Sequence, residues 1–288
     1  MKIIYTSDLH GIEGLYSQLF RLAVNWQAEA IIIGGDLLPK HGAFSTSVED
    51  QRDFINHFMK PKLEEIHGKL PGMEVYAMMG NDDWLINMPY LEELQSYGLL
   101  RLLHNRKYRL GKGFEIIGYG NVPPTPFSIK DSERIDTADA PVEPQHFASY
   151  VSGDKDIRQI DSATHFSRHN TMEEELAKLP VPESYKKTVY VMHAPPFQTN
   201  LDVLYDGRPV GSRAIRQFIE KTQPYLTLHG HIHEAPSRSG SYRDKIGHTV
   251  CINPGQTTDE LHAVMFKLED VLNTMNHTIF GSDLESVI

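Results

Sequence analysis

The sequence predicts a mixed α/β protein that contains two β-sheets. Apolar runs typical of buried strands alternate with helical patterns in the first third of the chain, whereas strand-like runs dominate the last third. A chain of 288 residues is long enough to bury a full hydrophobic core. We expect residues 1–288 to form a single domain with one long insertion at residues 121–170.

The first third of the chain is predicted to alternate strands with helices. Ala30–Ile33 is a continuous apolar run closed by two glycines, which is typical of a buried strand. Before this strand, apolar residues that include Leu15 and Leu19 recur at helical spacing. Pro89 favours a helix start and Gly98 a helix stop. The strands expected here are Lys2–Tyr5, Ala30–Ile33 and Glu74–Met79, and the helices are Ile12–Ala28, Val48–His67 with a bend at Pro61, and Pro89–Gly98.

In the remainder of the chain, strand patterns are more frequent than helical ones. Gly111-Lys112-Gly113 separates two strand-like runs and is typical of a hairpin turn. Thr171 and Ser212 are suitable N-caps for two further helices. The strands expected here are Tyr108–Leu110, Phe114–Tyr119, Thr188–Met192, Tyr225–Leu228, Thr249–Ile252, Ala263–Leu268 and Thr278–Phe280, and the helices run from Thr171 to Leu179 and from Arg213 to Lys221.

The composition argues against several classes of protein. Lys and Arg number 28 against 38 for Asp and Glu, so the formal net charge is −10 and no basic run offers a surface for nucleic acid or anionic lipid. No apolar run approaches the roughly 20 residues that cross a bilayer. Cys251 is the only cysteine, which excludes an intrachain disulfide and a thiolate metal cluster. Because no signal peptide precedes the first strand, we expect a cytoplasmic protein.

Five short polar segments each follow a predicted strand and carry residue types that bind metals. Together they offer two carboxylates, four imidazoles and one amide, a set that suits Zn, Mn, Fe or Ni better than Mg or Ca. Seven ligands are too many for one tetrahedral ion but suit two ions if a carboxylate bridges them. The segments are Asp8-Leu9-His10, Gly35-Asp36, Gly80-Asn81-Asp82, His193-Ala194-Pro195-Pro196 and Gly230-His231-Ile232-His233.

Each of these segments has an ordinary structural explanation when it is considered alone. A Gly-Asp or Gly-Asn-Asp-Asp sequence is a common turn, and a His-x-His pair is often exposed on an edge. Loops at the ends of strands, however, can direct side chains to one point. Because all five segments follow strands, we expect them to form one metal centre. His229, beside the last segment, is a candidate for supporting a ligand from behind.

The order of these segments resembles the pattern of the calcineurin-like metallophosphoesterase superfamily: Asp-x-His, Gly-Asp, Gly-Asn-His, a lone His and Gly-His-x-His. The match spans about Asp8 to Pro254 and includes the trailing Asn253-Pro254-Gly255. The resemblance implies a four-layer α/β/β/α sandwich of two mixed β-sheets flanked by helices. It also implies that one ion is held by Asp8, His10 and His233, the other by Asn81, His193 and His231, and that Asp36 bridges the two.

One residue departs from the family pattern. Asp82 stands where the family usually has a histidine that protonates the leaving group or holds the phosphate. The implied metal ligands are therefore complete, while the usual general acid is missing. Asn81 and Asp82 are the candidate catalytic residues, Asn81 because it would help to neutralise charge on the phosphoryl oxygens. The sequence leaves open whether Asp82 is ionised, because burial would raise its pKa and nearby metal ions would lower it.

The resemblance and the ligand types predict a dinuclear metal-dependent phosphoesterase that acts on a small phosphorylated substrate. Two divalent or trivalent transition-metal ions, such as Mn, Fe or Zn, would lower the pKa of a bridging water toward roughly 7, and the resulting hydroxide would attack phosphorus in line. An ionised Asp82 would repel a monoester dianion more than a diester, so we expect a preference for diesters. The alternative is a non-catalytic metal-binding scaffold or regulatory protein that retains the fold.

The segment from Asn121 to about Asn170 follows neither the helical nor the strand period. It is rich in proline and charge, and a stretch of this length without structure is uncommon in a compact domain unless it is functional or poorly ordered. We expect it to pack near the metal site as a cap or to lie at a subunit interface. The oligomeric state and the substrate remain open at this point.

Overall fold

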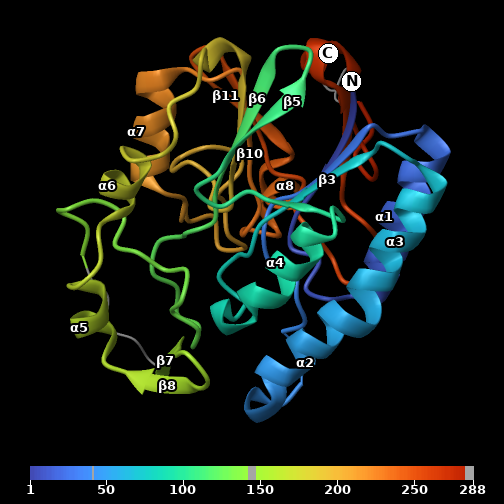
Figure 1. Cartoon of the computed structure of the whole chain (residues 1–288). Coiled ribbons are helices and arrows are strands. Elements are labelled where there is room, and N and C mark those ends of the chain that lie inside the picture. The colour runs from blue at the N-terminus through green and yellow to red at the C-terminus, as the bar shows by residue number, and fades with distance from the viewer. Residues whose placement is uncertain (41, 142–146, 283–288) are drawn as a thin grey trace.

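The computed structural model describes residues 1–40, 42–141 and 147–282. These residues form two six-stranded sheets and a separate two-stranded hairpin (Figure 1). In order across each sheet, the first contains β14 (Asn276–His277), β13 (Val264–Lys267), β1 (Lys2–Thr6), β2 (Ala30–Ile33), β3 (Glu74–Ala77) and β4 (Arg101–Leu102), and the second contains β11 (Arg243–Ile246), β12 (Thr249–Ile252), β10 (Leu226–Leu228), β9 (Thr188–Met192), β6 (Phe114–Tyr119) and β5 (Lys107–Gly111). The hairpin pairs β7 (Ser149–Ser152) with β8 (Ile157–Ile160).

Both large sheets mix parallel and antiparallel pairs. In the first sheet β1, β2, β3 and β4 run parallel, while β13 pairs antiparallel with β1. In the second, β6, β9, β10 and β12 run parallel, while β5 and β11 are antiparallel edge strands. The carboxyl ends of the parallel strands within each sheet therefore meet at one edge, where loops can bring side chains together.

Helices cover the outer face of each sheet. The helices are α1 (Glu13–Trp26), α2 (Ser47–Phe54), α3 (Lys60–Lys69), α4 (Met88–Ser96), α5 (Ser162–Phe166), α6 (Met172–Leu176), α7 (Arg213–Thr222), α8 (Ala235–Ser239) and α9 (Val271–Thr274). Figure 1 shows α1 and α3 on one flank of the molecule and α6 and α7 on the other. Single 3₁₀ turns lie at Phe44–Thr46, Leu85–Asn87, Tyr185–Lys187 and Leu268–Asp270.

Three hydrophobic cores separate these layers. Alternate residues of β2 face opposite sides, so Ile31 packs with the helices of the first sheet while Ile32 packs between the two sheets. A third core lies between the second sheet and α6 and α7, where Tyr190 meets Leu176 and Ile215. The layers are therefore helix, sheet, sheet and helix, which confirms the predicted fold class.

Most predicted elements are present, and the differences have local causes. The helix predicted at Val48–His67 contains a π-helical turn at Ile55–Met59, directly before α3. Pro61 has no N–H to donate to the preceding turn, so the predicted bend takes the form of this wider turn. The strand predicted at Thr278–Phe280 is wrong. His277 and Gly281 exchange backbone hydrogen bonds of 3.0 Å, which makes the three residues between them a turn.

The segment at residues 121–170 has more structure than its sequence pattern indicated. It contributes the β7–β8 hairpin and α5, and residues 142–146 within it lie outside the described part. Asp131 accepts hydrogen bonds from the backbone N–H groups of Leu85 and Ser152, at 2.9 and 2.7 Å. The ring of Tyr150 lies 4.8 Å from that of Phe44. These contacts attach the segment to the loops that follow β2 and β3.

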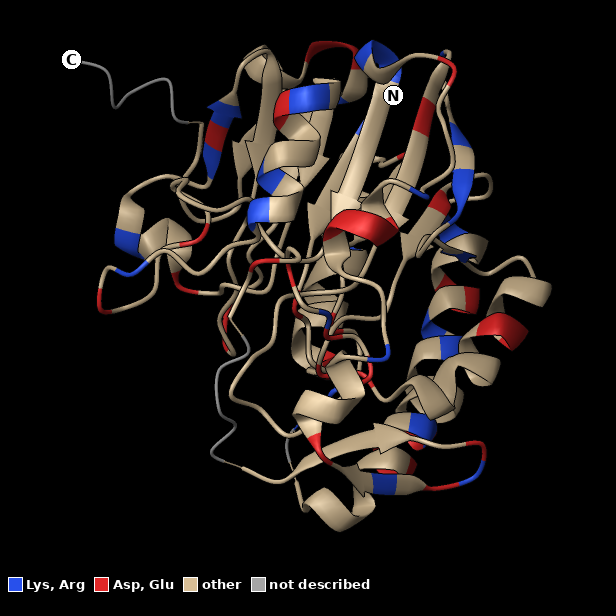
Figure 2. Ribbon diagram, turned by 90° about the vertical axis from the view of Figure 1, so that its left-hand side faces the viewer, with Lys and Arg blue, Asp and Glu red and all other residues tan. Residues whose placement is uncertain are grey.

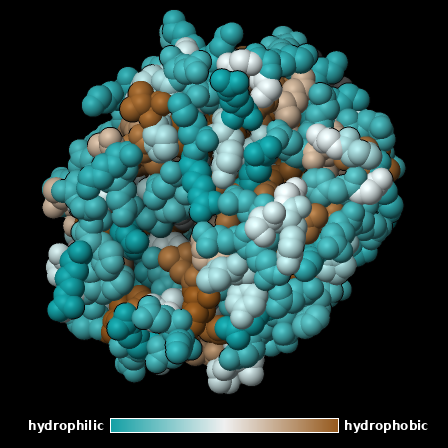
Figure 3. Space-filling model, in the orientation of Figure 1, coloured by the Kyte–Doolittle hydropathy of each residue, from teal (hydrophilic) through white to brown (hydrophobic). Residues whose placement is uncertain are grey.

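The charged residues of both signs are mixed over the chain (Figure 2), and the face seen in Figure 3 is mainly hydrophilic. Figure 2 shows Lys and Arg interspersed with Asp and Glu over the ribbon. Figure 3 shows a mostly hydrophilic face, on which apolar atoms are seen chiefly in hollows between elements. Among the described residues, no helix combines the length and the apolar character that a membrane span requires.

Cys251 is predicted to be unreactive in the folded protein. Its side chain on β12 has no exposed surface, and burial raises the pKa of the thiol to about 12. Since the thiolate is the reactive form, we expect Ellman's reagent at pH 8 to modify the native protein at least about 100-fold more slowly than the protein unfolded in guanidinium chloride. Equal rates in the two states would show that this packing is wrong.

Candidate metal centre

All seven predicted metal-ligand residues lie on loops at the carboxyl ends of parallel strands. The loops after β1 and β2 run together, because the N–H of Asp8 donates to the carbonyl of Gly35 at 3.0 Å and that of His10 to the carbonyl of Asp36 at 2.9 Å. The Tyr5 hydroxyl of the first sheet donates to the carbonyl of His229 after β10 at 2.6 Å. The two sheets are thus joined at the edge where the ligand residues gather.

Four of these residues have a left-handed backbone conformation. The φ angles of Asp8, His10, Asp36 and His231 are 58°, 45°, 49° and 66°. Positive φ is uncommon for residues other than glycine, and such strain is characteristic of functional sites. The tertiary structure therefore holds four neighbouring side chains in directions that an unstrained backbone would rarely give them.

Three glycines of the motifs allow the loops to approach closely. A Cβ atom on Gly35 would lie 2.3 Å from Nδ1 of His193, and one on Gly80 would lie 2.2 Å from Oδ1 of Asp36. A Cβ atom on Gly230 would lie 2.4 Å from Oδ2 of Asp8. Because real atoms do not approach so closely, any side chain at these positions would displace the residues of the site.

A first cluster brings together four candidate ligands. Asp8, His10, Asp36 and His233 each offer one ligand atom, and these atoms all lie within 4.8 Å of one another. The Nε2 atoms of His10 and His233 are 3.2 Å apart, and Nε2 of His233 is 3.3 Å from Oδ1 of Asp8. Nδ1 of His10 is buried and has no hydrogen-bond partner among the described residues. Two imidazoles and two carboxylates converging on one point are a suitable ligand set for a transition-metal cation.

The other predicted ligands lie beside this cluster. Nε2 of His193 is 3.2 Å from Oδ1 of Asn81 and 3.4 Å from Oδ2 of Asp36. Nδ1 of His193 lies 2.9 Å from the carbonyl of Gly34, a contact that orients the ring and leaves Nε2 facing the carboxylate. The ring of His231 is centred 5.3 Å from that of His193. Asp36 therefore lies between the other residues of the first cluster and the group formed by Asn81, His193 and His231.

The charge states in the site follow from burial and from the neighbouring charges. Burial alone would raise the pKa of Asp8 and Asp36, but the adjacent imidazoles prevail and hold both pKa values well below their usual range. Burial lowers the pKa of His10 and of His231 to about 3. Burial also opposes a charged ring at His193, but the two carboxylates raise its pKa to about 9. The carboxylates are thus ionised, and His10 and His231 are neutral, the forms that bind metals.

Asp82 lies at the edge of this cluster and is paired with a lysine that the sequence did not indicate. Its Oδ2 is 3.3 Å from Nζ of Lys40, and its Oδ1 accepts a hydrogen bond from Nδ2 of Asn81 at 3.2 Å. Burial and the charge of Asp36 raise the pKa of Asp82 to about 6, while Lys40 opposes the rise. Only 13 % of the side chain is exposed, and its Oδ2 lies 3.9 Å from Nδ1 of His10, so Asp82 faces the site.

Two further buried side chains hold the loops in place. Asp83 accepts backbone hydrogen bonds from Gly80 at 2.9 Å, Leu37 at 3.0 Å and Leu38 at 2.8 Å, and thereby joins two ligand loops. Nδ1 of His229 lies 2.9 Å from the carbonyl of Ala194, directly after His193. The predicted supporting role of His229 therefore corresponds to a contact with the backbone of the loop that carries His193.

Replacing Asp83 with asparagine is expected to weaken the fold. The amide has one acceptor oxygen for three backbone donors, and its NH₂ group faces donors, so the free energy of unfolding should fall by about 2 kcal/mol. Urea unfolding followed by circular dichroism measures this change. Asp53→Asn is the matched control, because the Asp53 side chain on α2 is 70 % exposed. Equal midpoints for the two variants would contradict the role given to Asp83.

Comparisons with known proteins give one family match and several structural neighbours. A family model described as calcineurin-like phosphoesterase matches residues 1–235. No curated protein matches the chain. One crystal structure is 16 % identical with a TM-score of 0.59 and covers 97 % of this chain and 99 % of its own. The protein TT1561 of Thermus thermophilus is 17 % identical with a TM-score of 0.54, over 97 % of this chain and 98 % of the other. A dimetal phosphatase from Danio rerio is 11 % identical with a TM-score of 0.46, over 92 % of each chain. At these identities the first two structures establish similarity of fold alone.

Proposed function

Because the chain belongs to the calcineurin-like phosphoesterase family, we propose that it hydrolyses small phosphate esters with two transition-metal ions. The observation that carries this proposal is the cluster of Asp8, His10, Asp36 and His233, whose ligand atoms lie within 4.8 Å of one another. The cluster stands at the carboxyl ends of parallel strands, where open α/β sheets bind their ligands.

The proposal assigns each ligand by its place in the site. Asp8, His10 and His233 would hold one ion, and Asn81, His193 and His231 would hold the other. Asp36 would be shared by both, and its Oδ2 lies 3.8 Å from Nε2 of His10 and 3.4 Å from Nε2 of His193. When bound, two such ions supply a nucleophile at neutral pH by lowering the pKa of a water, and they neutralise charge on the transferring phosphoryl group.

The residues around these ligands bind and orient the substrate. Lys40 places an ammonium group 3.3 Å from Oδ2 of Asp82, beside the cluster. Asn81 donates to the carboxylate of Asp82 and so holds its own carboxamide in one orientation. A carboxylate at position 82 adds negative charge where an imidazole would add none. A phosphomonoester dianion is therefore repelled more than a diester monoanion, which is the basis for a proposed preference for diesters.

This preference can be tested with two chromogenic substrates after loading the protein with Mn²⁺. We expect kcat/KM for bis(4-nitrophenyl) phosphate to exceed that for 4-nitrophenyl phosphate, and Asp82→His to shift the ratio toward the monoester by at least about fivefold. A wild-type preference for the monoester that Asp82→His leaves unchanged would make Asp82 a bystander.

The same assay distinguishes an enzyme from a scaffold. A protein that binds two ions per chain but hydrolyses neither substrate would favour the non-catalytic alternative. Wild-type protein without added metal and the Asp36→Asn variant are the controls for contaminating phosphatase, because both should be inactive. Turnover that survives in both controls would mean that the activity does not come from this site.

A further inference from the structure

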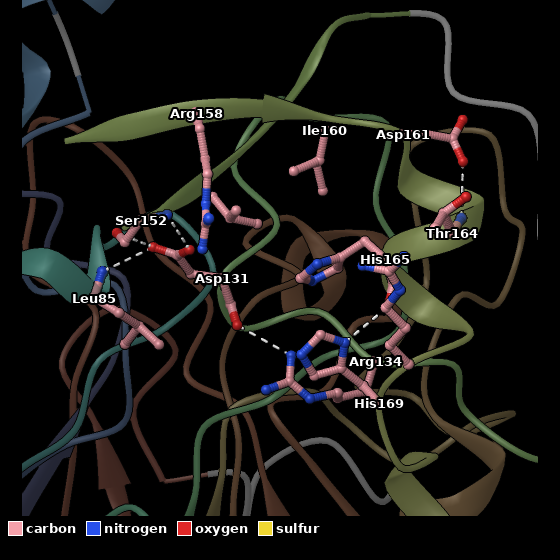
Figure 4. Close-up of a pocket in the computed structure, with 12 residues that line it drawn as sticks. Leu85, Asp131, Arg134, Ser152, Arg158, Ile160, Asp161, Thr164, His165 and His169 are labelled. Carbon is pink, nitrogen blue, oxygen red and sulfur yellow. Dashed lines mark hydrogen bonds between the residues drawn. The ribbon is translucent and has the colours of Figure 1, made fainter. Parts of the chain in front are cut away.

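A pocket lies between the 121–170 segment and the loop that follows β3. Its volume is about 560 Å³, within the range of small-molecule sites. Figure 4 shows side chains from β8, from α5 and from the loop around Asp131 arranged around it. We call it the arginine pocket, and its polar lining includes Arg134, Arg158, Arg168, His165, His169 and Asp131.

The arginine pocket is basic in a chain whose net charge is −10. Its lining includes three arginines and two aspartates, and both aspartates are engaged by the protein itself. Asp131 accepts hydrogen bonds from the N–H groups of Leu85 and Ser152, and Asp161 accepts from the N–H of Thr164 at 2.8 Å, at the start of α5. Among the described residues, neither carboxylate forms an ion pair with an arginine of the pocket.

Donors in the pocket remain available for a ligand. The side chains of Arg158 and Arg168 make no hydrogen bond or ion pair with any residue in the described ranges. Arg134 donates through Nε to Glu175 at 3.0 Å and through Nη1 to two backbone carbonyls, which leaves Nη2 without a partner among the described residues. Figure 4 shows Arg158 extending from β8 into the pocket. Planar guanidinium groups of this kind match the geometry of phosphate oxygens.

A buried nitrogen in the pocket also lacks a partner. Nε2 of His165 is buried and has no hydrogen-bond partner within the described part of the chain. Burial lowers the pKa of His165, and nearby positive charges, of which that of His169 has the largest effect, lower it further, to about 4. The ring is therefore neutral at physiological pH. A neutral imidazole has one N–H donor and one acceptor, and an unpaired buried nitrogen is costly. Because the ring donates its N–H to the backbone of Lys130, Nε2 is the acceptor, and a hydroxyl group of a ligand in the pocket would donate to it.

The lining of the pocket and the residues of the metal centre are joined by short stretches of chain. Leu85 lines the pocket and follows Asn81 by four residues, which span at most about 14 Å when fully extended. Lys130, next to Asp131, is close enough to Asp82 for the two charges to interact. In Figure 1, β7, β8 and α5 lie at the end of the molecule opposite the N-terminus, the end toward which β1 runs.

From these observations we infer that the arginine pocket binds a second phosphate group of the substrate, distant from the phosphorus attacked at the metal centre. The inference rests on the proposed function. The volume of the pocket exceeds that of one phosphate, and the apolar side chains of Leu85, Val151 and Ile160 line the rest of it. The substrate class is therefore a phosphoester whose organic part carries a further phosphate, such as a nucleotide phosphorylated at two positions.

The kinetic test uses two substrates with the same scissile bond. Thymidine 5′-(4-nitrophenyl phosphate) and its 3′-phosphorylated derivative release the same chromophore. For the wild type loaded with Mn²⁺, we expect the 3′-phosphate to lower KM about tenfold with little change in kcat, since charge-assisted contacts with guanidinium groups are strong. The double variant Arg158→Gln/Arg168→Gln should lose this advantage. Arg109→Gln should keep it, because Arg109 is an exposed residue of β5 outside the pocket lining and without a side-chain partner among the described residues.

A binding test separates this inference from the proposed function. Thymidine 3′,5′-bisphosphate is titrated calorimetrically into the full-length protein without added metal, and we expect binding to the wild type and to Arg109→Gln but not to the double variant. If neither chromogenic substrate is hydrolysed, the proposed function fails, and this titration alone decides whether the pocket binds the bisphosphate. Equal binding by all three proteins would overturn the inference. Binding of inorganic phosphate as tight as that of the bisphosphate would overturn the assignment to a substrate group.

Discussion

Replacing Asp36 with asparagine is expected to lower kcat/KM at least about 1000-fold, because in the proposed site this carboxylate would bridge both ions, whose joint stabilisation of the transition state is worth several kcal/mol. Asp36 is 2 % exposed, and its Oδ2 lies between Nε2 of His10 and Nε2 of His193. Asparagine keeps the size of the side chain but removes its negative charge and one acceptor oxygen. Steady-state hydrolysis of bis(4-nitrophenyl) phosphate with Mn²⁺ measures the loss.

The same substitution should also change metal binding in a way that a folding defect would not. Mn²⁺ at about 100 times its Kd should raise the free energy of unfolding of the wild type by about 2.7 kcal/mol, and Asp36→Asn should lose most of this increase. Without metal, the variant should be less stable than the wild type, because the ionised Asp36 is stabilised by His193 and accepts a hydrogen bond from the N–H of Asp82 at 2.9 Å, so the two proteins are compared by the increase that Mn²⁺ adds to each. Asp53→Asn on α2 should behave as wild type. Two bound ions per chain together with normal turnover in Asp36→Asn would exclude the bridging role.

Replacing Gly80 with alanine is expected to damage the site through the backbone. The added Cβ would lie 2.2 Å from Oδ1 of Asp36, 2.5 Å from its backbone nitrogen and 2.7 Å from Nε2 of His193. At least one of these groups must move, so kcat/KM should fall at least about 100-fold, since preorganised groups in a site lose most of their effect when displaced by about 1 Å. The free energy of unfolding should fall by about 1–3 kcal/mol, the usual cost of overpacking.

Gly68→Ala is the matched control for this substitution. Gly68 lies in α3, and no atom outside its own helix and its chain neighbours lies within 4 Å of the position that its Cβ would take. Alanine has the higher helix propensity, so this variant should retain full activity and gain up to about 1 kcal/mol of stability. Equal activity and equal urea midpoints for the two variants would show that the close approach at Gly80 is not required.

The fold could be predicted from the sequence wherever an element was long or strongly patterned. Apolar runs such as Ala30–Ile33 and capped helices such as Arg213–Thr222 were predicted close to their observed bounds, because burial and capping are encoded by neighbouring residues. β7 and β11 were missed because each has four residues and little apolar alternation. The strand predicted at Thr278–Phe280 was wrong, because backbone hydrogen bonds between His277 and Gly281 close these residues into a tight turn. A short apolar run does not indicate such hydrogen bonds.

The two-sheet fold and the residues gathered at one edge follow from local patterns in the chain, because each candidate ligand directly follows a strand. How these groups meet depends on contacts between distant segments. The pairing of Lys40 with Asp82, the close approach at Gly80 and the grouping of Arg134 with Arg158 and Arg168 all join separate segments. Such contacts depend on how the sheets and the 121–170 segment pack against one another, a relation that no local pattern of residues records.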